Sequence, residues 1–418
     1  MWKHYFNLPR PVYILCLGTF VNRAGSFFIV FLTIYLSQKL GFPTTFATKC
    51  MGLFGIGSLV ASLVGGQLAD QVGRRVVMLI SLFGGALILA VFGFLQSKYL
   101  IMAATLAFSL CIEMYRPAAS AMIGDLVKSD QRTHAFGLMY ISINLGFTAG
   151  ALIGGKLATV SFLWLFCGDA LTTFAYGMII LLFISETLPS RRKTPFPVIV
   201  DGEEFTGTPL PPEKSATLTE AAAHISRDWP FLLFCLSCLL TGLVFMQSMS
   251  TFPLYLSELG FAPDDYGRII AINGILIVLF QLPITSFISR FNRVTVIMLA
   301  AAIQGIGFGL IGYAATLYQF SLTIVVWTVG EMMQAPFTFA IVTDLAPSAL
   351  RGRYMGVFTM CFSSALMFGA PLGGMILADL GPAYLWNGCL IVNIIAVSLF
   401  FLIHKPVTNR SDAQLNLD

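Results

Sequence analysis

The sequence predicts an all-α integral membrane protein whose twelve transmembrane helices form two pseudo-symmetric six-helix bundles. Three observations support this fold class. Hydrophobic residues make up 57% of the chain and charged residues 11%, whereas soluble domains hold about 45–50% and about 25%. Apolar stretches that reach the roughly 20 residues needed to cross a bilayer recur along the chain. One long polar segment separates six of these stretches from the other six.

Hydropathy places the spans along the chain, with ends defined to within a few residues. The predicted spans are 11–36, 46–69, 76–96, 99–123, 135–160, 163–185, 229–256, 266–288, 294–314, 317–341, 354–378 and 384–403. The polar segment after the sixth span is rich in proline and charge, which is typical of a linker. Its last residues, EAAAHISRDW, suit a short surface helix. We expect an N-terminal bundle at 1–187, a cytoplasmic linker at 188–228, and a C-terminal bundle with a short cytoplasmic tail at 229–418.

The distribution of Lys and Arg predicts the orientation of these spans. Seventeen of them fall in the termini, the linker and the loops of one side, against Lys39 and Lys98 in the loops of the other. Cytoplasmic loops carry the positive excess, so both termini and the linker are expected in the cytoplasm. The N-terminal MWKHYFNLPRP lacks the apolar core of a signal peptide. We expect a multi-pass plasma membrane protein, with the bacterial inner membrane favoured.

The two halves of the chain resemble each other at an offset of 219 residues. The matching pairs include Pro117 with Pro336, Asp125 with Asp344, Arg132 with Arg351, and Gly150, Gly154 and Gly155 with Gly369, Gly373 and Gly374. Two six-helix halves related by duplication, with a central site between them, are a transporter architecture. The chain has no Walker-type Gly-Lys-Ser/Thr loop, and its four histidines fall in loops or termini, so no enzyme activity is expected.

The polar stretch between the second and third spans identifies a family. It reads GQLADQVGRR from Gly66 to Arg75 and resembles the signature loop of the major facilitator superfamily, G-x-L-A-D-x-x-G-R-[RK]. The resemblance extends over essentially the whole chain and implies transport by alternating access. It also implies a gating role for the residues of this loop and of its partner loops: Gly66, Asp70, Gly73, Arg74, Arg75, Asp125, Arg132, Asp344 and Arg351.

The second copy of this loop differs from the first. At the same offset, Ser289 replaces Asp70 and Asn292 replaces Gly73, while Arg293 corresponds to Arg74. Arg side chains pair with a carboxylate, and an acid near a helix N-terminus is favoured by the helix dipole. A latch that uses this acid is therefore expected in the first half alone.

Glycines in the fifth and eleventh spans predict close helix packing. Spacing of four places the first three glycines of the fifth span on one face, where small residues let helices approach. The twelve-helix proton-coupled drug exporters (DHA1 group), which the chain is most similar to, carry G-P-x-x-G-G in this helix; here Ala151 stands at the proline position. The expected packing residues are Gly146, Gly150, Gly154, Gly155, Gly369, Gly373 and Gly374.

Ionisable residues at membrane depth are costly and are functional by default. They are Arg23, Glu113, Arg116, Lys156, Asp169 and Glu331. Glu113 and Arg116 share a helix face and can pair. Glu331 has no basic residue within a helical turn, and burial without a cation favours the neutral form of a carboxyl. We expect Glu331 to carry the proton, with Glu113 as the rival.

A second set of polar residues is expected to bind substrate: Arg23, Arg116, Asn22, Asn144, Lys156, Gln247 and Gln334. Asn273 is a further polar candidate. Arg23 lies in the middle of its helix, where it could pair with Glu113 or with an anionic substrate group. Lys156 could instead extend to the membrane interface, and Asp169 is expected to pack or to cap a helix.

These residues and the family resemblance predict a secondary transporter, most similar to exporters that exchange amphiphilic small molecules for protons. The alternative is a proton-coupled importer, because Tyr140 to Gly146 is similar to a stretch of peptide symporters, although helix 1 lacks their E-x-x-E-R motif. A transceptor that binds without transporting is a third possibility. We expect the proton as coupling ion without a metal or organic cofactor, a small-molecule substrate and the lipid bilayer as partners, no nucleic acid, and a monomer.

Overall fold

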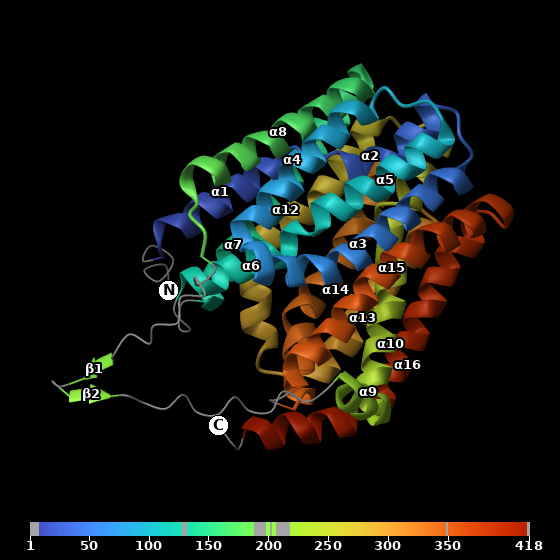
Figure 1. The fold of residues 1–418 in the computed structure, drawn as a ribbon. Coiled ribbons are helices and arrows are strands. Elements are labelled where there is room, and N and C mark those ends of the chain that lie inside the picture. The colour runs from blue at the N-terminus through green and yellow to red at the C-terminus, as the bar shows by residue number, and fades with distance from the viewer. Residues whose placement is uncertain are drawn as a thin grey trace.

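The computed structural model describes residues 8–127, 132–187, 198–200, 203–205, 218–347 and 350–415. Within these ranges, twelve helical segments are long and apolar enough to cross a membrane. They form two six-helix bundles (Figure 1). The predicted fold class is therefore confirmed, and most predicted span ends lie within a few residues of the observed ones.

The elements follow one another in the order of the predicted spans. The first bundle contains α1 (Arg10–Ala24), α2 (Phe28–Ile34), the π-helix η2 (Tyr35–Lys39), α3 (Thr44–Val72), α4 (Arg74–Phe92), α5 (Lys98–Glu113), α6 (Tyr115–Leu126), α7 (Arg132–Val160) and α8 (Phe162–Phe183). The strands β1 (Val198–Val200) and β2 (Glu203–Phe205) pair antiparallel in the linker, followed by α9 (Leu218–Arg227). The second bundle contains α10 (Trp229–Phe245), the 3₁₀ helix η4 (Met246–Ser248), α11 (Thr251–Glu258), α12 (Pro263–Ile288), α13 (Arg293–Ile311), α14 (Leu317–Leu345), α15 (Arg351–Asp379) and α16 (Pro382–Leu415).

Three predicted spans are not continuous helices. The span predicted at 11–36 is divided into α1 and α2, the span at 99–123 into α5 and α6, and the span at 229–256 into α10, η4 and α11. Breaks at membrane depth free backbone groups, which are tolerated where buried protein groups satisfy them. Hydropathy alone does not reveal such breaks, because the residues around them remain apolar.

At two of these breaks, buried side chains form hydrogen bonds with backbone groups. At the start of α2, the Phe28 backbone N–H donates to Asp169 Oδ2 of α8 at 2.9 Å, so Asp169 caps the second part of the broken helix. In the corresponding helix of the other half, Gln247 Nε2 donates to the carbonyls of Leu243 and Gly369, each at 2.8 Å. Both side chains are buried and hold an interrupted helix in place.

We expect Asp169→Ala to destabilise the protein by about 1–3 kcal/mol, because it leaves the buried Phe28 N–H without an acceptor. Asp169→Asn keeps an acceptor oxygen and should cost less. Thermal unfolding in detergent, compared with Asp379→Asn at an exposed site near the end of α15, measures the difference. Equal unfolding temperatures for Asp169→Ala and the Asp379 control would contradict the capping role.

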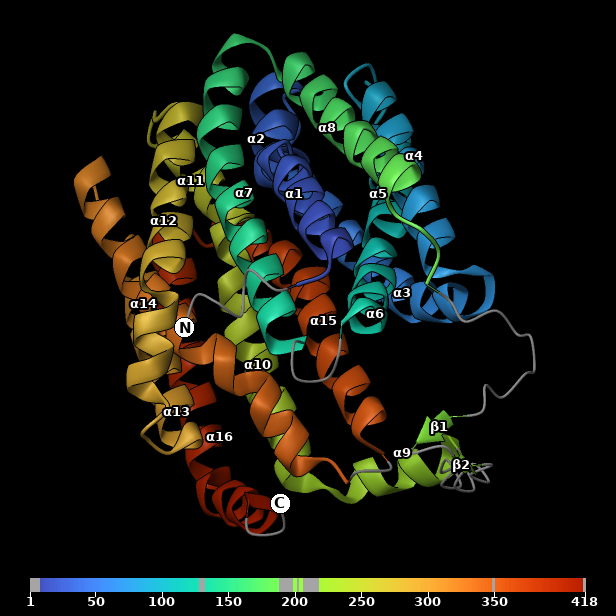
Figure 2. The ribbon, with the colours of Figure 1, turned by 90° about the vertical axis from the view of Figure 1, so that its left-hand side faces the viewer.

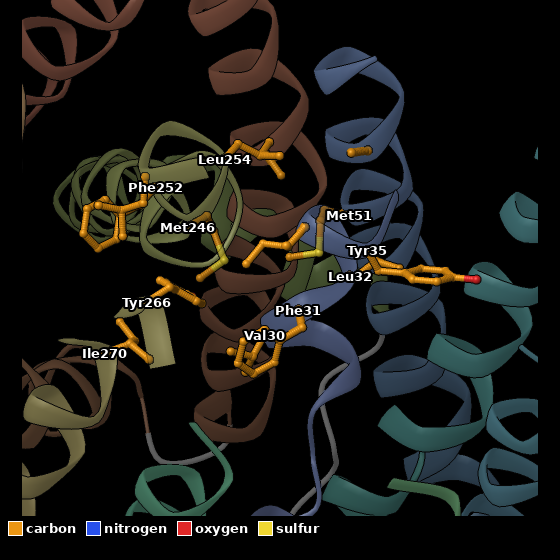
Figure 3. Close-up of a cluster of buried hydrophobic side chains, with 14 of the residues drawn as sticks. Val30, Phe31, Leu32, Tyr35, Met51, Met246, Phe252, Leu254, Tyr266 and Ile270 are labelled. Atoms are coloured by element: carbon orange, nitrogen blue, oxygen red, sulfur yellow. The ribbon is translucent and has the colours of Figure 1, made fainter. Parts of the chain in front are cut away.

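The two bundles meet at one end of the molecule. We call the end where α8 stops and α10 begins the linker end, and the opposite end the far end; in Figure 2 the far end is directed toward the top, and α10 begins near the bottom. At the far end one buried apolar cluster contains residues of both halves. Figure 3 shows part of it, where Phe31 of α2 faces Tyr266 of α12 with their ring centroids 5.9 Å apart.

Small residues let the backbones of the two halves approach in this region. Helix α7 lies beside α12 (Figure 2), and α3 lies beside α15. A Cβ added at Gly155 would lie 3.0 Å from the Cα of Asp264 and 3.3 Å from that of Gly267. A Cβ added at Gly52 would lie 2.5 Å from Pro371 of α15. These contacts leave no room for larger side chains.

The linker end is built differently. Each half has its own buried apolar cluster there, one around Val12, Met78 and Met122 and the other around Phe231 and Ile297. Neither cluster contains residues of the other half. The described structure is therefore closed at the far end, while its halves are separate toward the linker end.

Candidate functional site

A cavity of about 450 Å³ lies between the halves, on the linker side of the far-end contact. Helices α6 and α7 of the first half contribute Arg116 and Tyr140 to its lining. The second half contributes the polar residues Thr241, Gln304, Glu331 and Gln334. It also contributes an aromatic wall: Phe245, Phe339, Phe358 and Phe362.

Glu331 lies in the middle of α14 and borders this cavity. Its Oε2 accepts a hydrogen bond of 2.6 Å from Asn273 Nδ2 of α12, which also lies 3.1 Å from Thr328 Oγ1. Among the described residues, no basic side chain forms an ion pair with Glu331. The carboxyl is therefore held by a neutral amide at the edge of a largely apolar cavity.

Arg116 provides the cationic group on the opposite wall. Its Nε lies 3.3 Å from Glu113 Oε2, so the predicted pair is present. The Glu113 carboxylate also accepts a 3.4 Å hydrogen bond from Ser58. Arg116 is 55% exposed and Glu113 only 12%. The pair leaves the guanidinium open toward the cavity and the carboxylate covered.

Arg23 lies on α1 behind this pair. It is within electrostatic range of Glu113, Arg116 and Asp169, but within the described part of the chain it forms no ion pair with any of them. Of the two roles open to Arg23 in the sequence, pairing with Glu113 is not seen in this conformation, because Glu113 pairs with Arg116. The first half therefore brings Arg23 close to the Glu113–Arg116 pair.

Five predicted substrate-binding residues do not belong to the described lining of the cavity: Arg23, described above, and Asn22, Asn144, Gln247 and Lys156. Asn22 donates to Thr173 Oγ1 at 2.9 Å, and Asn144 donates to the Tyr140 carbonyl at 2.9 Å. Gln247 is held at the break before α11 by the bonds described above. Lys156 is exposed near the end of α7. Their role in substrate binding stays a prediction.

Gln334 lies in the lining, as expected, and donates to Thr241 Oγ1 at 3.2 Å. Gln304 was not expected there. Its side chain is 3% exposed, and its Oε1 has no hydrogen-bond partner among the described residues. Gln304 sits in an apolar helix where a single amide gives no periodic signal, so only the packing of α13 against α14 shows that it borders the cavity.

The signature loop holds α4 against α8 and α6. Gly73 adopts φ +115°, in the left-handed region that favours glycine, and the backbone N–H groups of Arg74 and Arg75 donate to the Glu186 carboxylate at 3.0 Å each. Arg75 also donates to the Leu181 carbonyl at 2.6 Å. Glu186, which the sequence did not single out, thus caps α4 from the end of α8. Gly66 lies in α3 near Pro117.

Each half contains a corresponding ion pair at the linker end. Arg74 Nε lies 2.8 Å from Asp125 Oδ2, and Arg293 Nη1 lies 2.5 Å from Asp344 Oδ2. These two pairs correspond at the offset of 219 residues. In the second half the side chain of Asn292 caps α13, accepting from Val294 and Thr295 at 3.0 and 3.1 Å. The side chains of Asp70, Arg132 and Arg351 lie outside the described residues.

The predicted packing glycines lie at close helix contacts. In the fifth span they face α1 and α2: a Cβ at Gly146 or Gly150 would approach Arg23, and one at Gly154 would approach Phe31. Gly155 faces the second half, as described above. In the eleventh span, Gly369 and Gly373 face Leu243 and Gln247 within the second half, whereas Gly374 faces Thr48 of the first half.

Two duplicated bundles, in contact at one end and enclosing a cavity with ionisable residues, define the class of secondary transporters. The family model described as Major Facilitator Superfamily matches residues 15–267 and 248–416. The chain belongs to the Major Facilitator Superfamily and is a multi-pass membrane transporter.

Individual relatives and structures are similar over most of the chain. The Na(+), Li(+), K(+)/H(+) antiporter of Planococcus maritimus is 25% identical over 376 residues, which cover 84% of this chain and 86% of that protein. Multidrug resistance protein MdtH of Escherichia coli (strain SE11) is 22% identical over 367 residues, covering 85% and 84%. A solved POT family transporter in complex with a thioalcohol conjugated peptide has a TM-score of 0.75 at 17% identity, covering 96% and 98%. At 17% identity, this last similarity shows a shared fold only.

Proposed function

We propose that this transporter exports amphiphilic small molecules in exchange for protons. The observation that carries the proposal is the position of Glu331, a carboxyl that is bonded to Asn273 and lines the central cavity together with four Phe side chains. A wall of Phe side chains suits apolar and variable substrates, and a carboxyl held without a cation favours its protonated form. The similarity to a cation/H(+) antiporter supports exchange against protons, and the similarity to a multidrug resistance protein supports amphiphilic small molecules as the substrate class.

In the proposed cycle, substrate and proton compete at Glu331. Substrate enters the cavity and lies against Arg116 and Gln334, while deprotonation of Glu331 accompanies its binding. Arg23 supplies a second positive charge behind Arg116. Glu113 becomes the alternative proton carrier when substrate draws Arg116 away from it.

We propose that the linker end faces the cytoplasm, because the Lys and Arg excess lies there. The described conformation is then open to the cytoplasm and closed to the outside. The bodies that rock against each other are residues 1–187 and 229–418, joined by the linker 188–228. Closing the linker end brings the signature loop of the first half toward the second half, and Asp70 with Arg74 and Arg75 biases that state.

A proton-coupled importer is the second candidate. Arg116 and Glu331 lie on opposite walls of one cavity, an arrangement that complements a substrate with separated negative and positive groups. A solved structure of similar fold holds a thioalcohol conjugated peptide. Both candidates use the same ionisable residues. In the exporter, proton and substrate move in opposite directions, and in the importer they move in the same direction.

Proton flux in oriented proteoliposomes tests the proposal. A panel of amphiphilic cations, neutral drugs and dipeptides is added to vesicles that contain a pH-sensitive dye, with protein-free vesicles as control. Antiport predicts that at least one amphiphile moves protons against its own direction. Co-directional movement, above all with a dipeptide, would identify a symporter, and binding without any flux would identify a transceptor.

A further inference from the structure

A second pocket lies at the linker end, away from the central cavity. It has a volume of about 530 Å³ and is lined by Ala223, His224, Arg227, Asp228 and Arg410. The first three come from α9, and Arg410 comes from the last turns of α16. The pocket therefore brings three basic side chains and one acid together where the linker helix meets the C-terminal helix.

The single acid of this pocket is already fully engaged. Arg410 Nη1 lies 2.9 and 2.8 Å from the two carboxylate oxygens of Asp228. The Tyr354 hydroxyl donates to the same carboxylate at 2.8 Å, and the Phe231 backbone N–H donates to it at 3.4 Å. Asp228 is 5% exposed. It neutralises Arg410 and has no capacity left for a further cation.

The remaining basic groups keep an excess of positive charge in the pocket. His224 Nδ1 lies 2.9 Å from the Tyr354 hydroxyl, which fixes the ring against α15. Arg227 is exposed, and in the described part of the chain no carboxylate forms an ion pair with it. A guanidinium without a carboxylate, beside an imidazole and a second Arg, is suited to an oxyanion.

The pocket also lies at the depth of a membrane surface. Helix α9 runs across the linker end beneath α10 and α15 (Figure 2), and it turns Ile225 into the apolar cluster of the second half. Trp229, the next residue after Asp228, is 52% exposed, and Trp is enriched at membrane–water interfaces. Leu232 and Leu236 of α10 and Leu402 of α16 are exposed nearby along the chain, as lipid-facing residues are.

We propose that this pocket binds the phosphate of an anionic phospholipid headgroup from the adjacent leaflet. Arg227 and His224 contact the phosphate oxygens, and the open side of Arg410 completes the site. Basic pockets between helices bind such headgroups. A free phosphate ion shares this chemistry, but the neighbouring apolar surface of α10 and α16 gives acyl chains a place to lie.

Tyr354 connects this site to the far-end contact. It belongs to α15, whose other end packs against α3 of the first half, and it bonds both His224 and Asp228. A bound headgroup therefore holds α9 against α15 and α16. The inference concerns binding at the membrane surface and does not depend on the proposed direction of transport.

Lipid retention tests the site. The full-length protein is reconstituted in nanodiscs of phosphatidylcholine with or without phosphatidylglycerol, and bound lipid and unfolding temperature are measured by native mass spectrometry and thermal denaturation. Wild type should retain phosphatidylglycerol and unfold at a higher temperature with it. Arg227→Gln and His224→Gln should each weaken retention about tenfold, as expected for one charge-assisted hydrogen bond.

Arg290→Gln is the matched control, because it removes the same charge from an exposed position at the linker end outside the pocket. Retention that falls equally in Arg227→Gln and Arg290→Gln would overturn the site in favour of general surface charge. Inorganic phosphate is added to phosphatidylcholine nanodiscs as a further arm. If it reproduces the stabilisation, the site binds a soluble anion and the lipid assignment is wrong.

Discussion

Glu331→Gln is expected to reduce proton-driven transport to the level of protein-free vesicles, while substrate exchange in the absence of a proton gradient continues. The amide resembles the protonated carboxyl, so the cavity keeps its shape and its bond to Asn273, but no proton can be bound and released. Proteoliposomes assayed in parallel for pH-driven uptake and for counterflow measure both properties.

Glu258→Gln provides the matched control, since it removes an exposed acid at the end of α11 far from the cavity. It should leave both properties unchanged. If Glu331→Gln retains pH-driven transport and Glu113→Gln loses it, the proton carrier is Glu113. Loss of counterflow together with pH-driven uptake would instead assign Glu331 to substrate binding or to the stability of the fold.

Gly267→Val is expected to prevent the halves from closing at the far end. In the structure a Cβ at Gly267 would meet the Ala151 carbonyl group and lie 3.1 Å from the Cα of Gly155. These are backbone atoms that cannot rotate away. Overpacking costs about 1–3 kcal/mol, which corresponds to a shift of about 5–150-fold in the population of the closed state. Transport should fall accordingly.

Hydrogen–deuterium exchange reports this shift directly. Amides at 151–160 and 263–270 should exchange faster in Gly267→Val, because opening the far end exposes both segments. Gly388→Val is the control, since a Cβ at Gly388 has no neighbour within 4 Å. Unchanged exchange at both segments, with normal transport, would show that the α7–α12 contact is not a gate.

Much of the fold could be predicted from the sequence, because it depends on properties of short segments. Hydropathy located all twelve spans, and the repeat at 219 residues predicted the correspondence that appears as the Arg74–Asp125 and Arg293–Asp344 pairs. The Glu113–Arg116 pair followed from helical spacing alone. Each of these features is encoded within one span or in a direct match between two segments.

The candidate site could be predicted from the sequence only in part. Arg116, Glu331 and Gln334 border the cavity, whereas Asn22 and Gln247 form hydrogen bonds elsewhere. All five are polar residues in apolar spans, and the sequence offers no means to separate them. The direction in which a helix turns its polar side chain depends on its neighbours.

Three things were determined by the sequence itself: the membrane fold, the superfamily, and the identity of the rare charges at membrane depth. The tertiary structure decided which end is closed, where helices break, and which partner each charge meets. The reason is physical. Asn273 and Glu331 are 58 residues apart, and Phe28 and Asp169 are 141 apart, so their contacts exist only when separate helices pack. Glu331 is a candidate proton carrier because packing places an amide, and not a cation, beside its carboxyl.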